Sequence, residues 1–500
     1  MDDKIKANNV RLPHFWEALA VLLFAIIVIG ACAIEWSAFL DDPWFGGDTF
    51  LHLPLMLSAV LAAIVAKRCG YKWKQIERGI FNGIYSVLQA VLILITVGAL
   101  IGVWIRAGVT PSLIYYGLAI LHPSIFLVTA LLICSITSLI IGTSWGTAGT
   151  IGVAFMGIGM GLGIPPAITA GAVISGAYFG DKIAPLSDTT NMAAAIAGVD
   201  LIAHIKNMFR QTGIAYVFAI IAFLVIGFIY SGSANLEGAV AIQNALRSEF
   251  NLSPALLLPI LIVLVAIVLK VPALPGIFLG VILGIIFGMI FQERVGIESM
   301  INTVYSGIAA DYYVFAETNE LLAGRGGILR KWFAVSVIII ALSFGGIMEM
   351  SRQLEVIVNK IIKTFVRGTG SLVATTVGTT FVTNMAMADQ YLGIILPAKM
   401  FSTAYKTRGF HPKMLSAAVD GTGTMTSALV PWNTCGVAMA SFVGVSTFAY
   451  LPFAFFNWSV PIVIIILGAI GKFTRKIEDD PNTIIDPLAA TSTFDNVKAE

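Results

Sequence analysis

Long apolar runs occupy most of this 500-residue chain, and they leave few folds open to it. Hydrophobic residues make up 58% of the sequence and charged residues only 12%, which is more apolar surface than a soluble domain can bury. Lipid admits only helices and closed barrels, because these satisfy their own backbone hydrogen bonds. Barrel strands would alternate over about ten residues, whereas these runs are continuous and longer. We therefore expect an all-α polytopic membrane protein with about 10–13 membrane segments.

The charged residues between the runs predict how the chain crosses the membrane. A basic loop over residues 67–78 follows the second run, and further basic residues, at 472–476, follow the last one. Basic loops stay in the cytoplasm, so we expect both termini there and the acidic connection at residues 35–48 outside. The segment 300–322, which carries three acidic residues, is expected to be a mobile or amphipathic connection. A net charge of +2 gives no indication of a nucleic-acid partner.

Residues 180–191, GDKIAPLSDTTN, interrupt two apolar runs with an unusual density of polar groups. A charged side chain deep in a bilayer costs about 3 kcal/mol or more, and Pro185 frees backbone carbonyls by breaking a helix. We expect an unwound part of a membrane helix that lines a cavity; a solvated loop is the alternative. The candidate ligands here are Asp181, Lys182, Ser187, Asp188, Thr189, Thr190 and Asn191.

A second interruption, GTSWGTAGT, begins at Gly142. Its hydroxyl side chains, those of Thr143, Ser144 and Thr147, are expected at the tip of a re-entrant hairpin, although small residues for helix packing explain the segment as well. Residues 142–146 of this segment, GTSWG, match the nucleophile-elbow pattern GxSxG. That pattern needs a strand before the serine, and neither a strand signal nor a nearby histidine is present, so we do not expect an enzyme.

The second half of the chain has two comparable interruptions. The first, TNMAMADQYLGIILP, has the candidate ligands Asn384, Asp389 and Gln390, and the second, DGTGTMTSALVPWNTCG, has Asp420, Thr426, Asn433 and Thr434. An intramembrane carboxylate is a functional candidate, while a helix cap is the alternative for Asp389. The four scattered cysteines indicate no disulfide framework or metal cluster, and the histidines are mostly interpreted as residues at span ends.

The interruptions recur at one spacing. Val382 follows Gly142 by 240 residues (382 − 142), and Asp420 follows Gly180 by the same interval (420 − 180). Paired interruptions at matching positions of two halves indicate a transporter site. The spacing predicts a first repeat over residues 83–230 and a second over residues 330–470, within one transporter domain. The relative orientation of the halves is not given by the sequence.

These motifs resemble the NhaC-type sodium/proton antiporter family. The similarity covers residues 84–470 and is strongest in GTSWGTAGTIG, GAVISGAYFGDKIAPLSDTTN, ADQYLGIILP and LVPWNTCG. The resemblance implies two inverted repeats with re-entrant hairpins and discontinuous helices, sodium coupling, and a prokaryotic inner membrane. The chain departs from the family motif at Ala184, where a serine is common, and the loss of a hydroxyl there would alter a ligand set that used it.

We therefore expect a secondary active sodium/proton antiporter that works by alternating access. Asp181, Asp188 and Asp389 are the expected sodium ligands, because hard oxygen atoms suit a small hard cation. A carboxylate that holds either Na⁺ or H⁺, but not both, couples the two fluxes. No cofactor is expected beyond the transported sodium, and the other partners are membrane lipid and, as one assembly, a second copy of the chain.

Two other functions remain open from the sequence. A sodium-coupled carrier or exchanger of a small organic acid, malate-like or lactate-like, or of an amino acid would use the same place, since Lys182 and the amides of Asn384, Gln390 and Asn433 suit a carboxylate substrate. A membrane-embedded hydrolase would need a metal or a base beside Ser144.

Overall fold

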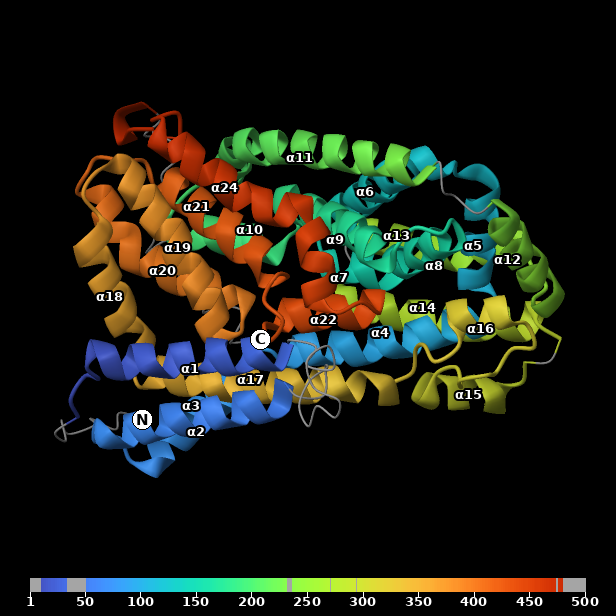
Figure 1. Ribbon diagram of the computed structural model, residues 1–500, viewed down its shortest axis with the longest axis horizontal. Helices are drawn as coiled ribbons and strands as arrows, with labels where there is room; N and C mark the ends of the chain where they lie inside the picture. The colour runs from blue at the N-terminus through green and yellow to red at the C-terminus, as the bar shows by residue number, and fades with distance from the viewer. Residues whose placement is uncertain are drawn as a thin grey trace.

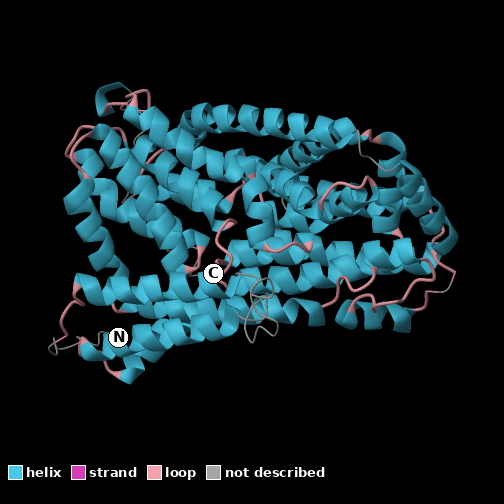
Figure 2. Ribbon diagram, viewed as in Figure 1, coloured by secondary structure: helices cyan, strands magenta, loops and turns pink. Residues whose placement is uncertain are grey.

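The computed structural model describes residues 10–33, 51–231, 236–269, 271–293, 295–473 and 475–479. The described residues are helical almost throughout, and no strand is drawn for them in Figure 2. An isolated bridge between Phe410 and Lys476 is the exception. This confirms the expected all-α fold. The acidic connection at residues 35–48 and the tail beyond residue 479 lie outside the described residues.

Five helices in the described part of the chain are long and apolar enough to cross a membrane, and two bent helix pairs raise the number to as many as seven. The five are α4 (Leu88–Arg106), α6 (Pro123–Ile141), α11 (Leu201–Ser231), α14 (Ala273–Phe291) and α17 (Trp332–Met350). Several spans expected from the sequence instead form parts of broken helices, and these parts do not meet the combined criterion of length and hydropathy alone.

The long helices run along one axis, which is horizontal in Figure 1. One layer, at the bottom of that view, holds α1 (Phe15–Ala33), α2 (His52–Arg68), α3 (Trp73–Tyr85), α4 and α17. Glycines allow α3 and α17 to approach closely, since a side chain at Gly79 or Gly83 would meet the backbone of α17. The broken helices lie between this layer and α11, which runs along the opposite face.

Each half of the chain contains two broken helices, at the polar interruptions named above. In the first half the breaks separate α6 from α7 (Ser144–Thr147), and α9 (Pro166–Ile183) from α10 (Asp188–Ala197). A π-helical turn (Ala148–Gly152) and α8 (Val153–Gly161) follow α7. In the second half the breaks separate α19 (Thr369–Met387) from α20 (Gln390–Lys406), and α21 (Pro412–Ser427) from α22 (Thr434–Val443). The expected discontinuous helices are thus present.

The N-cap residues of the helices after each break give the register of the two halves. Thr143 and Asp389 are 246 residues apart (389 − 143), and so are Ser187 and Asn433 (433 − 187). The structural spacing is therefore 246 residues rather than the 240 obtained from the sequence, because the residues that match at an interval of 240 do not lie at equivalent distances from the helix starts.

The two helix pairs around the first breaks enter from opposite ends of the molecule. In Figure 1, α6 and α8 lie to the right of the first break, whereas α19 and α20 lie to the left of theirs. Left-handed backbone makes both turns, with φ +77° at Gly142 and +55° at Ala388. The inverted relation between the halves, and the repeat boundaries, stay predictions.

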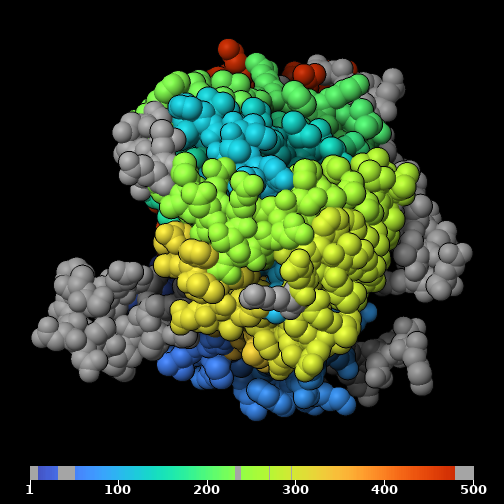
Figure 3. Space-filling model, turned by 90° about the vertical axis from the view of Figure 1, so that its right-hand side faces the viewer, coloured from blue at the N-terminus to red at the C-terminus, as the bar shows by residue number. Residues whose placement is uncertain are grey.

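The segment between the halves closes one end of the molecule. It contains α12 (Leu236–Glu249), α13 (Leu258–Val268), α14, α15 (Ile297–Ser306) and α16 (Ala316–Leu322). Figure 3 views this end directly, and the segment, coloured lime to yellow, covers the middle of the face. The predicted connection at residues 300–322 thus includes two short helices.

We expect Gly180→Ala to destabilise the protein by about 1–3 kcal/mol, the usual range for overpacking. A Cβ at Gly180 would meet the backbone of α6 at Ser135 and Leu139. The matched control is Gly378→Ala in α19, where a Cβ has open space and alanine favours the helix. Thermal unfolding in detergent measures both variants. Equal midpoints would show that α6 and α9 do not pack as closely as described.

Candidate functional site

Each broken helix presents the N-terminus of its second part at the break. Backbone N–H groups in the first turn of a helix lack helical partners and carry partial positive charge. The N-cap side chains of Asp389 and Asn433 accept bonds from Leu392 N, at 2.9 Å, and Cys435 N, at 3.0 Å. Asp389 therefore does act as a helix cap, the alternative interpretation of this residue, through its Oδ1.

The two breaks of the first half contact each other. Ser144 N donates to Asp181 Oδ2 at 3.1 Å, and the side chain of Asp181 is buried. Beside it, Gly142 lies so close to Leu186 that a Cβ there would clash. Asp181, at the end of α9, is therefore held against the start of α7.

Several side chains of this half that were expected to bind an ion instead donate hydrogen bonds to backbone carbonyls. Asn191 Nδ2 donates to the carbonyls of Pro185 and Ser187, both at 2.8 Å, and Thr190 Oγ1 donates to Lys182 O at 3.0 Å. These bonds close the break that Pro185 opens. Ser187 Oγ and Thr189 Oγ1 also bond to each other, at 3.1 Å, and Thr147 Oγ1 donates to Thr143 O at 3.1 Å.

Asp188 differs from Asp181 in its surroundings. It occupies the first position of α10 and is an exposed residue, whereas Asp181 is 6% exposed. A carboxylate at a helix N-terminus is favoured by the partial positive charge there. The two carboxylates that the sequence treats as equivalent thus have different environments.

The two breaks of the second half are also joined. Thr434 N donates to Ala388 O at 2.9 Å, and Cys435 Sγ donates to Gln390 Oε1 at 2.6 Å. Asn384 donates to Thr426 Oγ1 at 2.8 Å and to Gly423 O at 2.7 Å. The predicted residues of this half, Asn384, Asp389, Gln390, Thr426, Asn433 and Thr434, are therefore brought together.

A buried charged cluster joins the two halves. Lys182 Nζ lies 3.3 Å from Asp420 Oδ2, and His204 Nε2 lies 3.4 Å from the same oxygen. Thr424 Oγ1 donates to Asp420 Oδ1 at 2.6 Å, and His204 Nδ1 lies 2.8 Å from Ser416 Oγ. The side chains of Lys182, His204 and Asp420 are fully buried. A buried ion pair of this kind tolerates the loss of either partner poorly.

His204 belongs to this cluster although the histidines were expected mostly at span ends. Asp200 was the sequence signal that could have placed His204. Its side chain accepts a hydrogen bond from Ala203 N at 2.9 Å, as a helix cap does, and α11 begins at the next residue. A helix that starts there carries His204 in its first turn, where α11 packs against α10 and α21.

Three threonines of the second half were also missed, although Asn384 was among the expected ligands. Within the described residues, Asn384 Oδ1 and the hydroxyls of Thr379, Thr380 and Thr422 are buried without a hydrogen-bond partner. Thr380 and Asn384 are four residues apart on α19 and so share one helix face, and α19 packs against α21. Buried oxygens of this type are what a dehydrated cation would satisfy.

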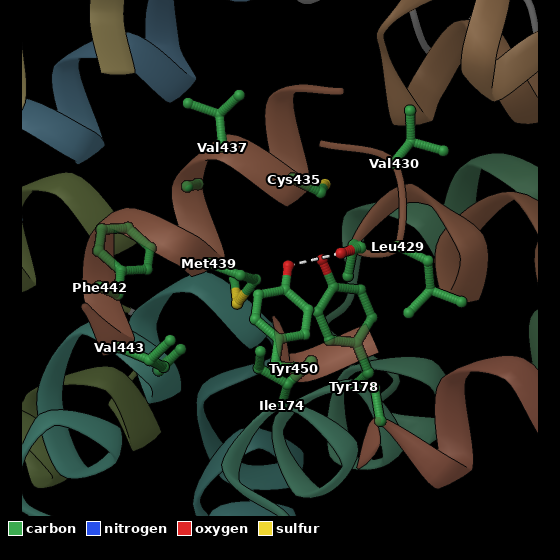
Figure 4. Packing of buried hydrophobic residues seen from close by; sticks show 14 of the residues in the cluster. Ile174, Tyr178, Leu429, Val430, Cys435, Val437, Met439, Phe442, Val443 and Tyr450 are labelled. Carbon is green, nitrogen blue, oxygen red and sulfur yellow. Dashed lines mark hydrogen bonds between the residues drawn. The ribbon is translucent and has the colours of Figure 1, made fainter. Parts of the chain in front are cut away.

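An apolar wall lies beside the break between α21 and α22. Figure 4 shows Tyr178 of α9 and Tyr450 of α23 (Thr447–Tyr450) side by side, with their hydroxyls toward that break. Tyr450 Oη donates to Ala428 O at 2.6 Å, a carbonyl at the end of α21. The wall thus fixes the break, and residues of α22 such as Val437 and Phe442 form its other side.

The residues before Ser144 form the helix α6. A nucleophile elbow requires a strand at this place, so the GxSxG match is not supported by its structural context.

The sequence model of the Na⁺/H⁺ antiporter family matches residues 14–177 and 176–472. The chain is 40% identical to the malate-2H⁺/Na⁺-lactate antiporter of Bacillus subtilis, over 93% of this chain and 97% of that protein. It is 36% identical to the Na⁺/H⁺ antiporter NhaC of Alkalihalophilus pseudofirmus, over 84% and 90%. It is 34% identical to the arginine/ornithine antiporter ArcD of Halobacterium salinarum, over 88% and 91%.

Proposed function

Because this chain belongs to the Na⁺/H⁺ antiporter family, we propose that it is a secondary active antiporter that exchanges Na⁺ for H⁺ by alternating access. The observation that carries the proposal is the buried carboxylate of Asp181, held by Ser144 N where two breaks meet. It acts in the inner membrane of a prokaryote, with both termini in the cytoplasm, and needs no cofactor beyond the transported ion.

Asp181 couples the two ions in this proposal. Its Oδ2 accepts from Ser144 N, and the carboxylate is the group that binds Na⁺ or a proton in turn. One carboxylate oxygen cannot hold both, so the site exchanges one for the other. Asp389 and the unpartnered oxygens of Asn384 and Thr380 supply ligands from the second half. Asp188, exposed at the start of α10, attracts the ion toward the breaks.

Lys182, His204 and Asp420 have a positioning role. They tie the end of α9 and the start of α11 to α21, so Asp181 keeps its place beside α7. A rocking motion of the halves has to move this cluster as a unit or separate its charges, and separation in a dry interior is costly.

The alternative is the exchange of a small organic acid or an amino acid together with these ions. Two relatives of this chain are named as a malate-2H⁺/Na⁺-lactate antiporter and an arginine/ornithine antiporter. Lys182 and Asn384, which the sequence offered to a carboxylate, already bond to Asp420 and to Gly423 and Thr426, so this alternative rests mainly on the two relatives. The two functions differ in whether ion exchange needs an organic solute.

Flux in proteoliposomes separates them. We expect Na⁺ alone to dissipate an imposed pH gradient across vesicles that contain the purified chain, as reported by a pH-sensitive dye. Choline chloride, and vesicles without protein, are the controls. If the gradient collapses only after an organic acid or amino acid is added, the alternative is right and simple cation exchange is wrong.

A further inference from the structure

A cavity of about 890 Å³ adjoins the break between α21 and α22. Pro431, which lies in that break, lines the cavity, and so do Ser441 and Phe442 of α22. The turn 323–326 and the residues after it form another wall. This turn belongs to the connection between the two halves, so the cavity lies where that connection meets the second half.

Two aromatic rings join this cavity to the proposed ion site. Phe442 lines the cavity, and its ring meets the ring of Trp145 with the two centroids 6.0 Å apart. Trp145 directly follows Ser144, whose N–H group holds the carboxylate of Asp181. The cavity is therefore connected, through two side chains in contact, to the residue that holds Asp181.

Three cationic side chains line the cavity, and we call them the cationic wall: Arg325, Arg330 and Lys331. One acidic side chain, that of the exposed Glu320, lines it as well. Lys331 Nζ donates to Ser441 O at 2.6 Å and to Ser441 Oγ at 2.9 Å, and both of these acceptors are neutral. In the described part of the chain, no carboxylate lies within ion-pair distance of the cationic wall. The lining therefore keeps an excess of positive charge.

The backbone fixes the position of Arg325. This residue sits between Gly324 and Gly326, which have φ values of +69° and +71°. A Cβ at Gly326 would collide with the backbone of Gly102 in α4, so the turn lies directly on α4, a contact that only glycine permits. The backbone that carries the guanidinium group therefore cannot withdraw from the cavity without breaking this contact.

Such a lining repels the ions that the protein is proposed to exchange. Charges in a cleft with low-dielectric walls act on an approaching ion more strongly than the same charges do in bulk water. The concentration of Na⁺ inside the cavity is therefore lower than in the adjoining solution, and a cation that enters from this side crosses a region of positive potential before it reaches the two rings.

We propose that the cationic wall is an electrostatic barrier to Na⁺ that enters from the face of the membrane to which this cavity opens. The inference rests on the proposed antiport and makes Arg325, Arg330 and Lys331 the residues that render it asymmetric. The barrier changes the rate at which Na⁺ enters, and it leaves the equilibrium to the two ion gradients. Uptake of sodium from this face therefore needs a higher concentration than it would without the barrier.

The test measures the half-saturating concentration of Na⁺ for proton flux on each face separately. Right-side-out and everted membrane vesicles present the two faces, and both come from cells that make the full chain and lack other sodium/proton antiporters. We expect Arg325→Gln to lower this concentration about two- to fivefold on one face, because one charge of the barrier is removed, and to leave the other face unchanged. Arg325→Lys keeps the charge and should behave as the unchanged chain does.

Ionic strength gives a second readout, which a packing defect would not move. Raising choline chloride from about 0.01 M to about 0.1 M shortens the Debye length from about 30 Å to about 10 Å. We expect this screening to lower the half-saturating sodium concentration of the unchanged chain on the same face, and to have a smaller effect on Arg325→Gln. The control is Arg408→Gln, an exposed arginine outside the cavity lining, which should match the unchanged chain on both faces.

Arg330→Gln is the second variant, because Arg330 is exposed and its replacement disturbs less packing than that of Arg325. It should shift the half-saturating concentration in the same direction. Unchanged concentrations in both folded variants, equal shifts on the two faces, or an Arg325→Lys variant that behaves as Arg325→Gln would each overturn the inference. Sodium-driven flux without this asymmetry leaves the antiport standing and removes the barrier, whereas no sodium-driven flux in the unchanged chain removes both.

Discussion

Asp181→Asn is expected to abolish sodium-dependent proton flux in proteoliposomes while leaving the protein folded. The amide oxygen still accepts from Ser144 N, so the contact between α9 and α7 survives. The charge that binds Na⁺ and the group that takes up the proton are both lost. The measurement is the rate at which added Na⁺ dissipates a pH gradient, with the unfolding midpoint as a check on folding.

Asp188→Asn is the matched control for that experiment. Its carboxylate is exposed at the start of α10, where it attracts cations but is not enclosed with them. We expect this variant to need more sodium for half-maximal flux and to keep a measurable maximal rate. Full flux in Asp181→Asn, or complete loss in Asp188→Asn alone, would move the exchanging carboxylate from Asp181 to Asp188.

Asp420→Asn is expected to lower the free energy of unfolding by about 3–5 kcal/mol, the usual cost of removing one partner of a buried ion pair. Lys182 would be left charged and fully buried, with Met208 Sδ as its remaining side-chain neighbour, at 3.3 Å. Denaturant or thermal unfolding in detergent measures the loss. Asn keeps the volume of Asp, so the change reports charge rather than packing.

The double variant Lys182→Met with Asp420→Asn tests the cause. It removes both charges of the pair, and buried pairs replaced by uncharged groups are often neutral in stability. We expect the unfolding midpoint of the double variant to be well above that of Asp420→Asn. A loss equal to the sum of the two single losses would mean that the side chains do not interact.

The site could be predicted from the sequence only in part. The four polar interruptions coincide with the four breaks, because Pro185, Gly142 and the small polar residues act on the backbone within a few residues of themselves. The neighbours of these groups could not be predicted. Asp420 and Lys182 are 238 residues apart, and His204 joins them from a third helix.

The sequence by itself determined the membrane-helical class, the positions of the breaks and the family resemblance, since hydropathy and helix-breaking residues are local properties. Only the tertiary structure decided that Asp181 is enclosed while Asp188 is exposed, and that Asn191 and Thr190 bond to the backbone. It also placed Arg325 and Lys331 on a cavity between the halves. These outcomes depend on how distant helices pack, and packing joins residues whose separation along the chain carries no signal of their contact.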